Sequence, residues 1–336
     1  MSRTGWRVAK AMAVGAGVAA AATGSVLGVL AAQAQRTRRT IPMAEAPPPR
    51  GDGLYGGRLP GPPVSLVVLG DSSAAGYGVH RSRETPGVLL AMAISRRLRR
   101  PVRLHRFAVV GATSAGLAPQ VEAALEVKPD LAIILIGGND VTHRSSFTIA
   151  VRHLVNAVRD LRAAGVEVVV GTCPDLSTIQ PIKPPLRWLA RHWSRQLARA
   201  QTVAVVEAGG RTVSLADLLG PRFRAEPTRM FAWDRFHPSA DGYAVAVAAL
   251  LPTALAALGA GETRALSQAE GVRSLPQAAQ EAAKRAGTEV TGAQVAGRDR
   301  GPAGRWAELR RHTRWFTEPQ TSLDAAVPLG ETQRQV

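Results

Sequence analysis

The sequence contains a single cysteine, Cys173, and only 4% aromatic residues. One cysteine excludes an intrachain disulfide, so the chain is not a disulfide-stapled fold. Cys173 stands at a predicted strand end before Pro174, where we expect a small buried hydrophobe rather than a reactive thiol. No His, Cys, Asp or Glu cluster has metal-ligand spacing. Gly70, Gly76 and Gly78 precede no Gly-Lys-Ser/Thr of a phosphate-binding loop, so we expect neither a metal nor a cofactor.

Acidic residues are scarce beside basic ones, with 25 Asp and Glu against 42 Lys and Arg and a net charge of +17. No short basic block with interleaved aromatic residues marks a nucleic-acid surface, so we expect no nucleic-acid partner. The basic excess favours attraction to anionic membrane or envelope surfaces instead. Hydrophobic residues make up 46%, which is enough to bury the core of one large domain with extensions, or of two domains.

Charge is absent from Ala11 to Gln35, a stretch that is long enough to span a bilayer. Ala32-Gln33-Ala34 resembles a small-x-small cleavage site. Residues 1–40 are therefore predicted to be either a cleaved signal peptide or a retained membrane anchor, with a soluble Ala-rich helix as the alternative. Residues 41–63 contain seven prolines and several glycines, which predicts a stiff linker before a folded domain at 64–260.

Predicted strands and helices alternate from Val64 onward. The strands are expected at 64–69, 102–110, 131–136, 166–170 and 203–206, and the helices at 86–98, 117–127, 146–164, 184–200 and 240–258. Alternating units of this spacing indicate a parallel sheet that is covered on both faces. Residues 261–336 are polar and of mixed charge, so this tail is predicted to be mostly disordered. Within it, Trp306 to Phe316 is the exception, because Trp306, Leu309 and Trp315 could share part of a helical face.

A Gly-Asp-Ser tripeptide, Gly70-Asp71-Ser72, ends the first predicted strand. Open α/β sheets bind ligands at the carboxyl ends of their strands, so Ser72 is a candidate nucleophile by position. Taken alone, Asp71-Ser72 is more typical of a helix cap.

Later strand ends offer the partners that a nucleophilic serine needs. The backbone N–H of Gly111 and the side-chain amide of Asn139 are candidate donors to an oxyanion, although each residue also suits an ordinary turn. Asp234 stands three residues before His237. This spacing lets an Asp orient the imidazole of a catalytic base, and a surface ion pair or a helix cap is the alternative.

Together these residues resemble the SGNH/GDSL hydrolase family. The resemblance covers Val64 to Leu258 and rests on four blocks in the right order. They are Gly70-Asp71-Ser72 with Gly76, then Gly111, then Gly137-Gly138-Asn139-Asp140, then Asp234 with His237. One departure is visible, since many relatives have Leu-Thr after the serine and this chain has Ser73-Ala74. The departure alters the pocket floor, so no acyl-length preference is carried over.

The resemblance implies an α/β fold, a three-layer αβα sandwich with a flavodoxin-like parallel sheet of about five strands. It also implies ester hydrolysis without a metal or cofactor. Ser72 would be the nucleophile and His237 the base, with Asp234 holding the imidazole. Ser72, Gly111 and Asn139 would bind the oxyanion, and Asp71 and Asp140 would hold their loops in place.

The leading hypothesis from the sequence is a serine esterase or lipase-like acyl hydrolase that acts on a small-molecule ester or lipid. A carbohydrate or cell-wall O-acetyl esterase of the same fold is one alternative, and a non-catalytic envelope binding protein is another. The N-terminal segment predicts membrane association with an extracytoplasmic domain, or secretion. The sequence predicts no oligomeric state.

Overall fold

The fold is described from a computed structural model, which covers residues 24–25, 28–37, 39–40, 46–143, 146–215, 221–260, 272–285, 287–293 and 305–311. Five parallel strands form the centre of one sheet, in the order β3-β2-β4-β5-β6. They are β2 (Val64–Gly70), β3 (Val102–Arg106), β4 (Leu131–Leu135), β5 (Glu167–Gly171) and β6 (Arg211–Val213). Because the second strand lies outside the first, this order is the flavodoxin-like one, as expected.

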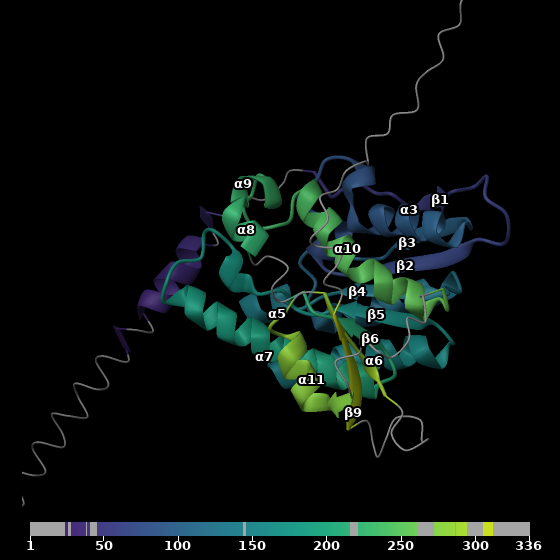
Figure 1. Cartoon of the computed structure of the whole chain (residues 1–336). Coiled ribbons are helices and arrows are strands. Elements are labelled where there is room, and N and C mark those ends of the chain that lie inside the picture. The colour runs from purple at the N-terminus through teal and green to yellow at the C-terminus, as the bar shows by residue number, and fades with distance from the viewer. Residues whose placement is uncertain are drawn as a thin grey trace, which may run out of the picture.

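Helices cover both faces of the sheet (Figure 1). The alternation of a strand sends successive side chains to opposite faces. Leu66 and Val68 of β2 therefore join one core cluster and Val67 and Leu69 join the other. The first cluster contains α3 (Pro86–Leu98) and α10 (Ala240–Ala257), and the second contains α4 (Leu117–Glu126) and α6 (Phe147–Ala163). The prediction of a three-layer αβα sandwich is confirmed.

The prediction of a fifth strand at 203–206 is wrong. These residues belong to α7 (Leu186–Glu207), and the fifth parallel strand follows it as β6. A short apolar run cannot be assigned from its own composition. Here Leu197, Gln201 and Val205 recur every four residues along the buried face, so the run is the last helical turn before Gly209 and Gly210.

Three described segments of the tail, at 272–285, 287–293 and 305–311, are ordered, whereas the sequence singled out only the region near Trp306. Its described residues form β7 (Val272–Ser274), α11 (Leu275–Ala282), β8 (Thr288–Gly292) and β9 (Trp306–Arg311). These strands extend the sheet beyond β6 in the order β8-β9-β7, and all three pairings are antiparallel. The helix expected near Trp306 is a strand, since Ala307 and Leu309 are buried and alternate with more exposed neighbours. Trp315 lies outside the described residues.

The sheet starts earlier than the sequence suggested. Strand β1 (Gly53–Tyr55) lies inside the expected linker and pairs antiparallel with β3. At the other end of the domain, α10 continues through Pro252 as a single helix. Within the described residues, α10 is also the helix whose length and apolarity would suffice to cross a membrane, and half of it is buried in the core. Residues 1–23, 26–27 and 38 of the expected signal or anchor lie outside the described residues, whereas 24–25, 28–37 and 39–40 are helical.

Candidate active site

The Gly-Asp-Ser tripeptide places Ser72 at the junction of β2 and α2 (Ser72–Ala75). Asp71 is the N-cap of this short helix, and its side chain accepts a hydrogen bond from the Ser73 N–H at 2.8 Å. Asp71 is therefore a helix cap, as the alternative interpretation of the tripeptide expected. The Ser72 hydroxyl takes no part in this cap and can make other contacts. Gly70 has a φ of 131°, and a Cβ there would lie 1.9 Å from the Leu135 carbonyl oxygen. Only glycine allows β2 to pass so close to β4 at this point.

Ser72, His237 and Asp234 form one continuous chain of hydrogen bonds. His237 Nε2 lies 2.8 Å from Ser72 Oγ, and His237 Nδ1 lies 2.5 Å from Asp234 Oδ2. The other Asp234 oxygen accepts the backbone N–H groups of Phe236 and His237, each at 2.9 Å. Ser72 is 8% exposed, His237 9% and Asp234 1%. The predicted spacing of Asp234 and His237 thus brings both side chains to the end of β2.

The acidity of Asp234 follows from these contacts. Burial alone would raise the pKa of this carboxyl, because it disfavours the charged form. The hydrogen bond and charge of His237, together with the two backbone N–H donors, outweigh burial and hold the pKa below its ordinary value. Asp234 is therefore a carboxylate at neutral pH, which favours an imidazole that donates from Nδ1 and presents Nε2 to Ser72.

The loop that carries Gly111 reaches the site although β3 ends earlier than predicted, at Arg106. Beyond this strand, the Phe107 N–H donates to the Val68 carbonyl and the Val109 N–H to the Gly70 carbonyl, both at 3.0 Å. The loop therefore continues along β2 as far as Gly70. Gly111 follows with a φ of 81°, a left-handed conformation that favours glycine.

The Asn139 block is tied to the same loop. Asn139 lies in α5 (Gly138–Thr142), directly after β4, and its side-chain amide donates to the Ala112 carbonyl at 3.0 Å. The neighbouring Asp140 is buried and accepts hydrogen bonds from the Ser114 backbone N–H and hydroxyl. These bonds join the second and third sequence blocks, so Gly111 and Asn139 lie on one connected loop cluster at the carboxyl end of the sheet.

Two comparisons with known sequences bear on this geometry. Residues 68–245 match the GDSL-like lipase/acylhydrolase family. The GDSL-like esterase Rv1075c of Mycobacterium tuberculosis is 46% identical over 230 residues, which cover 65% of this chain and 73% of that protein.

The chain belongs to the GDSL-like lipase/acylhydrolase family. It is a carboxylic ester hydrolase, as the four sequence blocks suggested. Looser likenesses exist among solved structures. A catalytic mutant of Axe2, an acetylxylan esterase from Geobacillus stearothermophilus, is 18% identical with a TM-score of 0.45, over 60% of this chain and 97% of that one. TesA is 24% identical with a TM-score of 0.44, over 56% of this chain and 97% of that one.

Two buried glutamines hold the strand ends of this GDSL-like hydrolase, and the sequence analysis missed both. Gln120 of α4 accepts from the Gly70 N–H at 2.7 Å and donates to the Gly70 carbonyl at 3.0 Å. Gln201 of α7 accepts from the Cys173 N–H at 2.8 Å and donates to the Ile136 carbonyl at 3.2 Å. A glutamine within the apolar face of an amphipathic helix is the signal that would have found them, because buried amides need partners.

Two other residues with reactive side chains, Cys173 and His143, lie near these loops. Cys173 is fully buried, as predicted, and burial together with nearby carboxylates such as Asp71 raises the pKa of its thiol well above the ordinary value. His143 contacts the Asn139 carbonyl through Nδ1. Within the described ranges, no group of three or more His, Cys, Asp or Glu residues is placed to hold a metal ion.

Proposed function

We propose that Ser72, His237 and Asp234 are the catalytic triad of this ester hydrolase. The observation that carries the proposal is the unbroken chain of hydrogen bonds from Asp234 through His237 to the Ser72 hydroxyl. A serine hydroxyl is a weak nucleophile until an adjacent base takes its proton, and His237 Nε2 is within hydrogen-bond reach of Ser72 Oγ.

In the acylation step, Ser72 Oγ attacks the ester carbonyl while its proton passes to His237 Nε2. Asp234 keeps the Nδ1 proton in place and stabilises the imidazolium that forms. His237 then gives the proton to the departing alkoxide, and the alcohol leaves. Water attacks the acyl-enzyme by the same route, with His237 again acting first as base and then as acid. The acid is released and Ser72 regains its proton.

The oxyanion of each tetrahedral intermediate would be bound by the Ser72 N–H, the Gly111 N–H and the Asn139 amide. Ser72 is the first residue of α2, where an N–H has no partner inside the helix. Within the described residues, neither the Ser72 N–H nor the Gly111 N–H has an acceptor. Asn139 uses one amide proton for Ala112 and keeps the other. Losing one such donor typically costs about 2.7–4 kcal/mol of barrier.

The full chain is the right material for the test, because β7 to β9 belong to the sheet. We expect it to hydrolyse 4-nitrophenyl acetate, and we expect Ser72→Ala to abolish turnover. Ser82→Ala, which removes an exposed hydroxyl, is the matched control and should retain activity. Turnover that survives Ser72→Ala would disprove the nucleophile. A panel of acyl lengths and acetylated glycans then distinguishes a lipase-like enzyme from an O-acetyl esterase.

We further propose that the enzyme works at or outside the cytoplasmic membrane, anchored or released through the residues that precede Gln33, since Gln33 itself bonds to the loop at Pro184. The uncharged run from Ala11 to Gln35 supports this placement. Carbonate extraction of membranes tests retention. If all of the protein is released with its N-terminus intact, the anchor is ruled out.

A further inference from the structure

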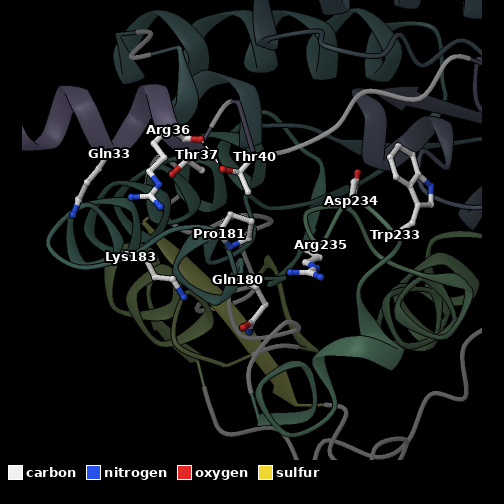
Figure 2. A pocket seen from close by; sticks show the side chains of 10 residues that line it. All are labelled: Gln33, Arg36, Thr37, Thr40, Gln180, Pro181, Lys183, Trp233, Asp234 and Arg235. Carbon is white, nitrogen blue, oxygen red and sulfur yellow. Dashed lines mark hydrogen bonds between the residues drawn. The ribbon is translucent and has the colours of Figure 1, made fainter.

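A basic cavity lies beside the candidate triad, and the four sequence blocks do not account for it. Its volume is about 700 Å³, and three segments that are distant in the sequence line it. Figure 2 shows them: the N-terminal helix with Arg36, the loop between β5 and α7 with Lys183, and the segment just before His237 with Trp233 and Arg235. All three cationic side chains belong to exposed residues.

The described lining of this cavity carries more positive than negative charge. Within the part of the chain that the structure describes, no carboxylate forms an ion pair with Arg36, Lys183 or Arg235. Asp234 is the acidic residue of the lining, and its two oxygens already accept from His237 and from backbone N–H groups. Three cations beside this one carboxylate leave the described lining positive, and a positive lining attracts an anionic group.

Hydrogen bonds between the lining segments and their neighbours hold the walls of the cavity in place. The side chain of Gln33 donates to the Pro184 carbonyl at 2.7 Å and accepts from the Leu186 N–H at 3.2 Å, which fixes the N-terminal helix on the loop. Arg235 has a φ of 56°, which is unusual for a residue other than glycine, and its N–H donates to the Ala232 carbonyl. Such backbone conformations concentrate at functional sites.

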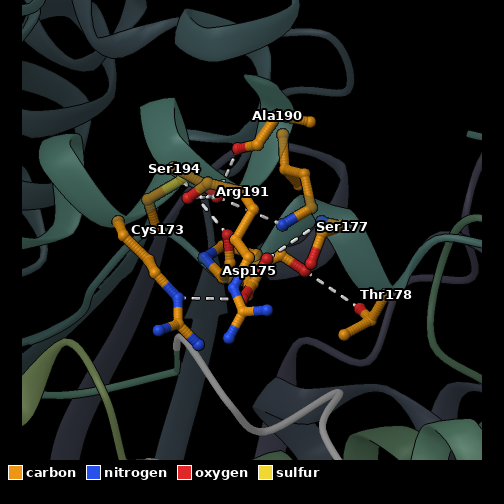
Figure 3. A network of polar contacts seen from close by, with 10 residues as sticks. Cys173, Asp175, Ser177, Thr178, Ala190, Arg191 and Ser194 are labelled. Carbon is orange, nitrogen blue, oxygen red and sulfur yellow. Dashed lines mark hydrogen bonds and ion pairs between the residues drawn. The ribbon is translucent and has the colours of Figure 1, made fainter. Parts of the chain in front are cut away.

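The Lys183 loop is anchored at its start by a buried carboxylate. Asp175 is 2% exposed, accepts from the Ser177 N–H at 3.0 Å, and pairs with Arg195 at 3.0 Å and Arg191 at 3.8 Å (Figure 3). Its backbone carbonyl also accepts from the Thr178 hydroxyl at 2.9 Å. These contacts connect the loop to the first turns of α7 and support the wall that carries Lys183.

The position of the cavity relative to His237 indicates which part of a substrate would enter it. His237 protonates the leaving alcohol in the mechanism above, so the alcohol lies on the His237 side of Ser72. On that side, the Tyr77 ring packs 4.5 Å from the His237 ring, and the Trp233 ring lies 6.3 Å from the Tyr77 ring. Trp233 is a wall of the cavity. The alcohol part of a bound ester therefore points toward the three cations.

We propose that this cavity is a specificity subsite for esters whose alcohol part carries an anionic group, such as a carboxylate or a phosphate. The proposal rests on the proposed function, because it uses His237 as the acid that frees the alcohol. Arg36, Lys183 and Arg235 bind the charged group and position the ester, and none of them takes part in the chemistry.

Matched substrate pairs test the subsite in the full chain. The first pair is 4-carboxyphenyl butyrate and its neutral isostere 4-carbamoylphenyl butyrate. The second pair is 1-butyrylglycerol 3-phosphate and 1-butyrylglycerol, in which a flexible chain joins the ester to the anionic group. We expect kcat/KM to favour the anionic member of at least one pair about tenfold or more, the worth of one charge-assisted hydrogen bond. Salt at about 1 M should erase this preference, because the Debye length falls to about 3 Å.

In the double variant Arg36→Gln/Lys183→Gln, the ratio of kcat/KM for the anionic ester to that for its neutral partner should fall close to one. Arg99→Gln removes an exposed arginine that also has a positive φ, and it should leave the preference unchanged. If neither anionic ester is preferred while the neutral esters are hydrolysed, the subsite is refuted and the triad stands. An equal loss in Arg99→Gln also refutes it, because the effect would then come from net charge. Failure on every ester, with no Ser72-dependent turnover, refutes the proposed function instead.

Discussion

The charge on Asp71 destabilises the fold at neutral pH, and Asp71→Asn should reveal this. Asp71 is 5% exposed and stands directly before the candidate nucleophile. Burial raises its pKa from 3.8 to about 6, and the nearby Asp140 acts in the same direction, while the Ser73 N–H and His237 act against it. Asparagine keeps an oxygen for the Ser73 N–H but carries no charge, so the substitution isolates the effect of ionisation.

The sign follows from proton binding. Between pH 3.8 and 6 the folded state holds a proton on Asp71 that the unfolded state has lost. The free energy of unfolding therefore falls as pH rises through this window, and the contribution is constant above it. Two pKa units correspond to about 3 kcal/mol. Asp71→Asn should thus gain about 3 kcal/mol relative to wild type between pH 4 and pH 7.

Urea unfolding of the full chain at pH 4, 5, 6 and 7 measures this difference. Asp160→Asn removes an exposed carboxylate from α6 and controls for the change in net charge. If Asp71→Asn and wild type show parallel pH profiles between 4 and 6, the carboxyl is not held in its protonated form. The reasoning from burial at this position would then be wrong.

Three other changes test the remaining parts of the account. Gln120→Ala leaves the Gly70 N–H and carbonyl without their buried partner, so the free energy of unfolding measured in urea should fall by about 2–4 kcal/mol. Unchanged stability would contradict the role given to Gln120. Asn139→Ala should lower kcat for 4-nitrophenyl acetate about 100- to 1000-fold with little change in KM, and an unaffected kcat would remove Asn139 from the oxyanion site. Truncation after Ala260 should expose β6 as an edge strand and uncover the side chain of Val206, so the fragment should aggregate in a light-scattering measurement. A monodisperse fragment of equal stability would show that β7 to β9 are dispensable.

The parallel core could be predicted because its elements carry strong local signals. Pro86–Leu98 begins with a proline at the first helical position and has the same bounds in the sequence and in the structure. The unbroken apolar run at 131–136 is typical of a buried strand in a parallel sheet, and β4 (Leu131–Leu135) occupies most of it. The strand order was predicted from the family resemblance, because the local sequence of a strand does not indicate which strands lie beside it.

The added strands could not be predicted, because long-range contacts decide them. Val290 and Leu309 are buried only because β8 and β9 pair and α11 covers them against α7. Taken alone, these segments are short and polar enough to suggest disorder. The run at 203–206 failed for a related reason, since its helical state depends on the buried face of α7 as a whole.

The candidate site divides in the same way. Ser72, Asp234 and His237 could be found because chemistry restricts which residue types serve at a strand end and at a spacing of three. Gln120 carried a signal that was missed, whereas the basic cavity could not be found because it exists only after folding. Gln120 is one polar residue in an apolar helix face, and Arg36, Lys183 and Arg235 meet from three separate segments.

Labelling with a fluorophosphonate tests the central claim most directly, because the reagent reacts with a serine only when a neighbouring base activates it. Mass spectrometry of the labelled full chain should find one adduct, on Ser72. Ser72→Ala should abolish labelling, and His237→Gln should slow it severely without unfolding the protein. No adduct, an adduct on another residue, or an unchanged rate in His237→Gln would contradict the assignment of Ser72 as the nucleophile that His237 activates.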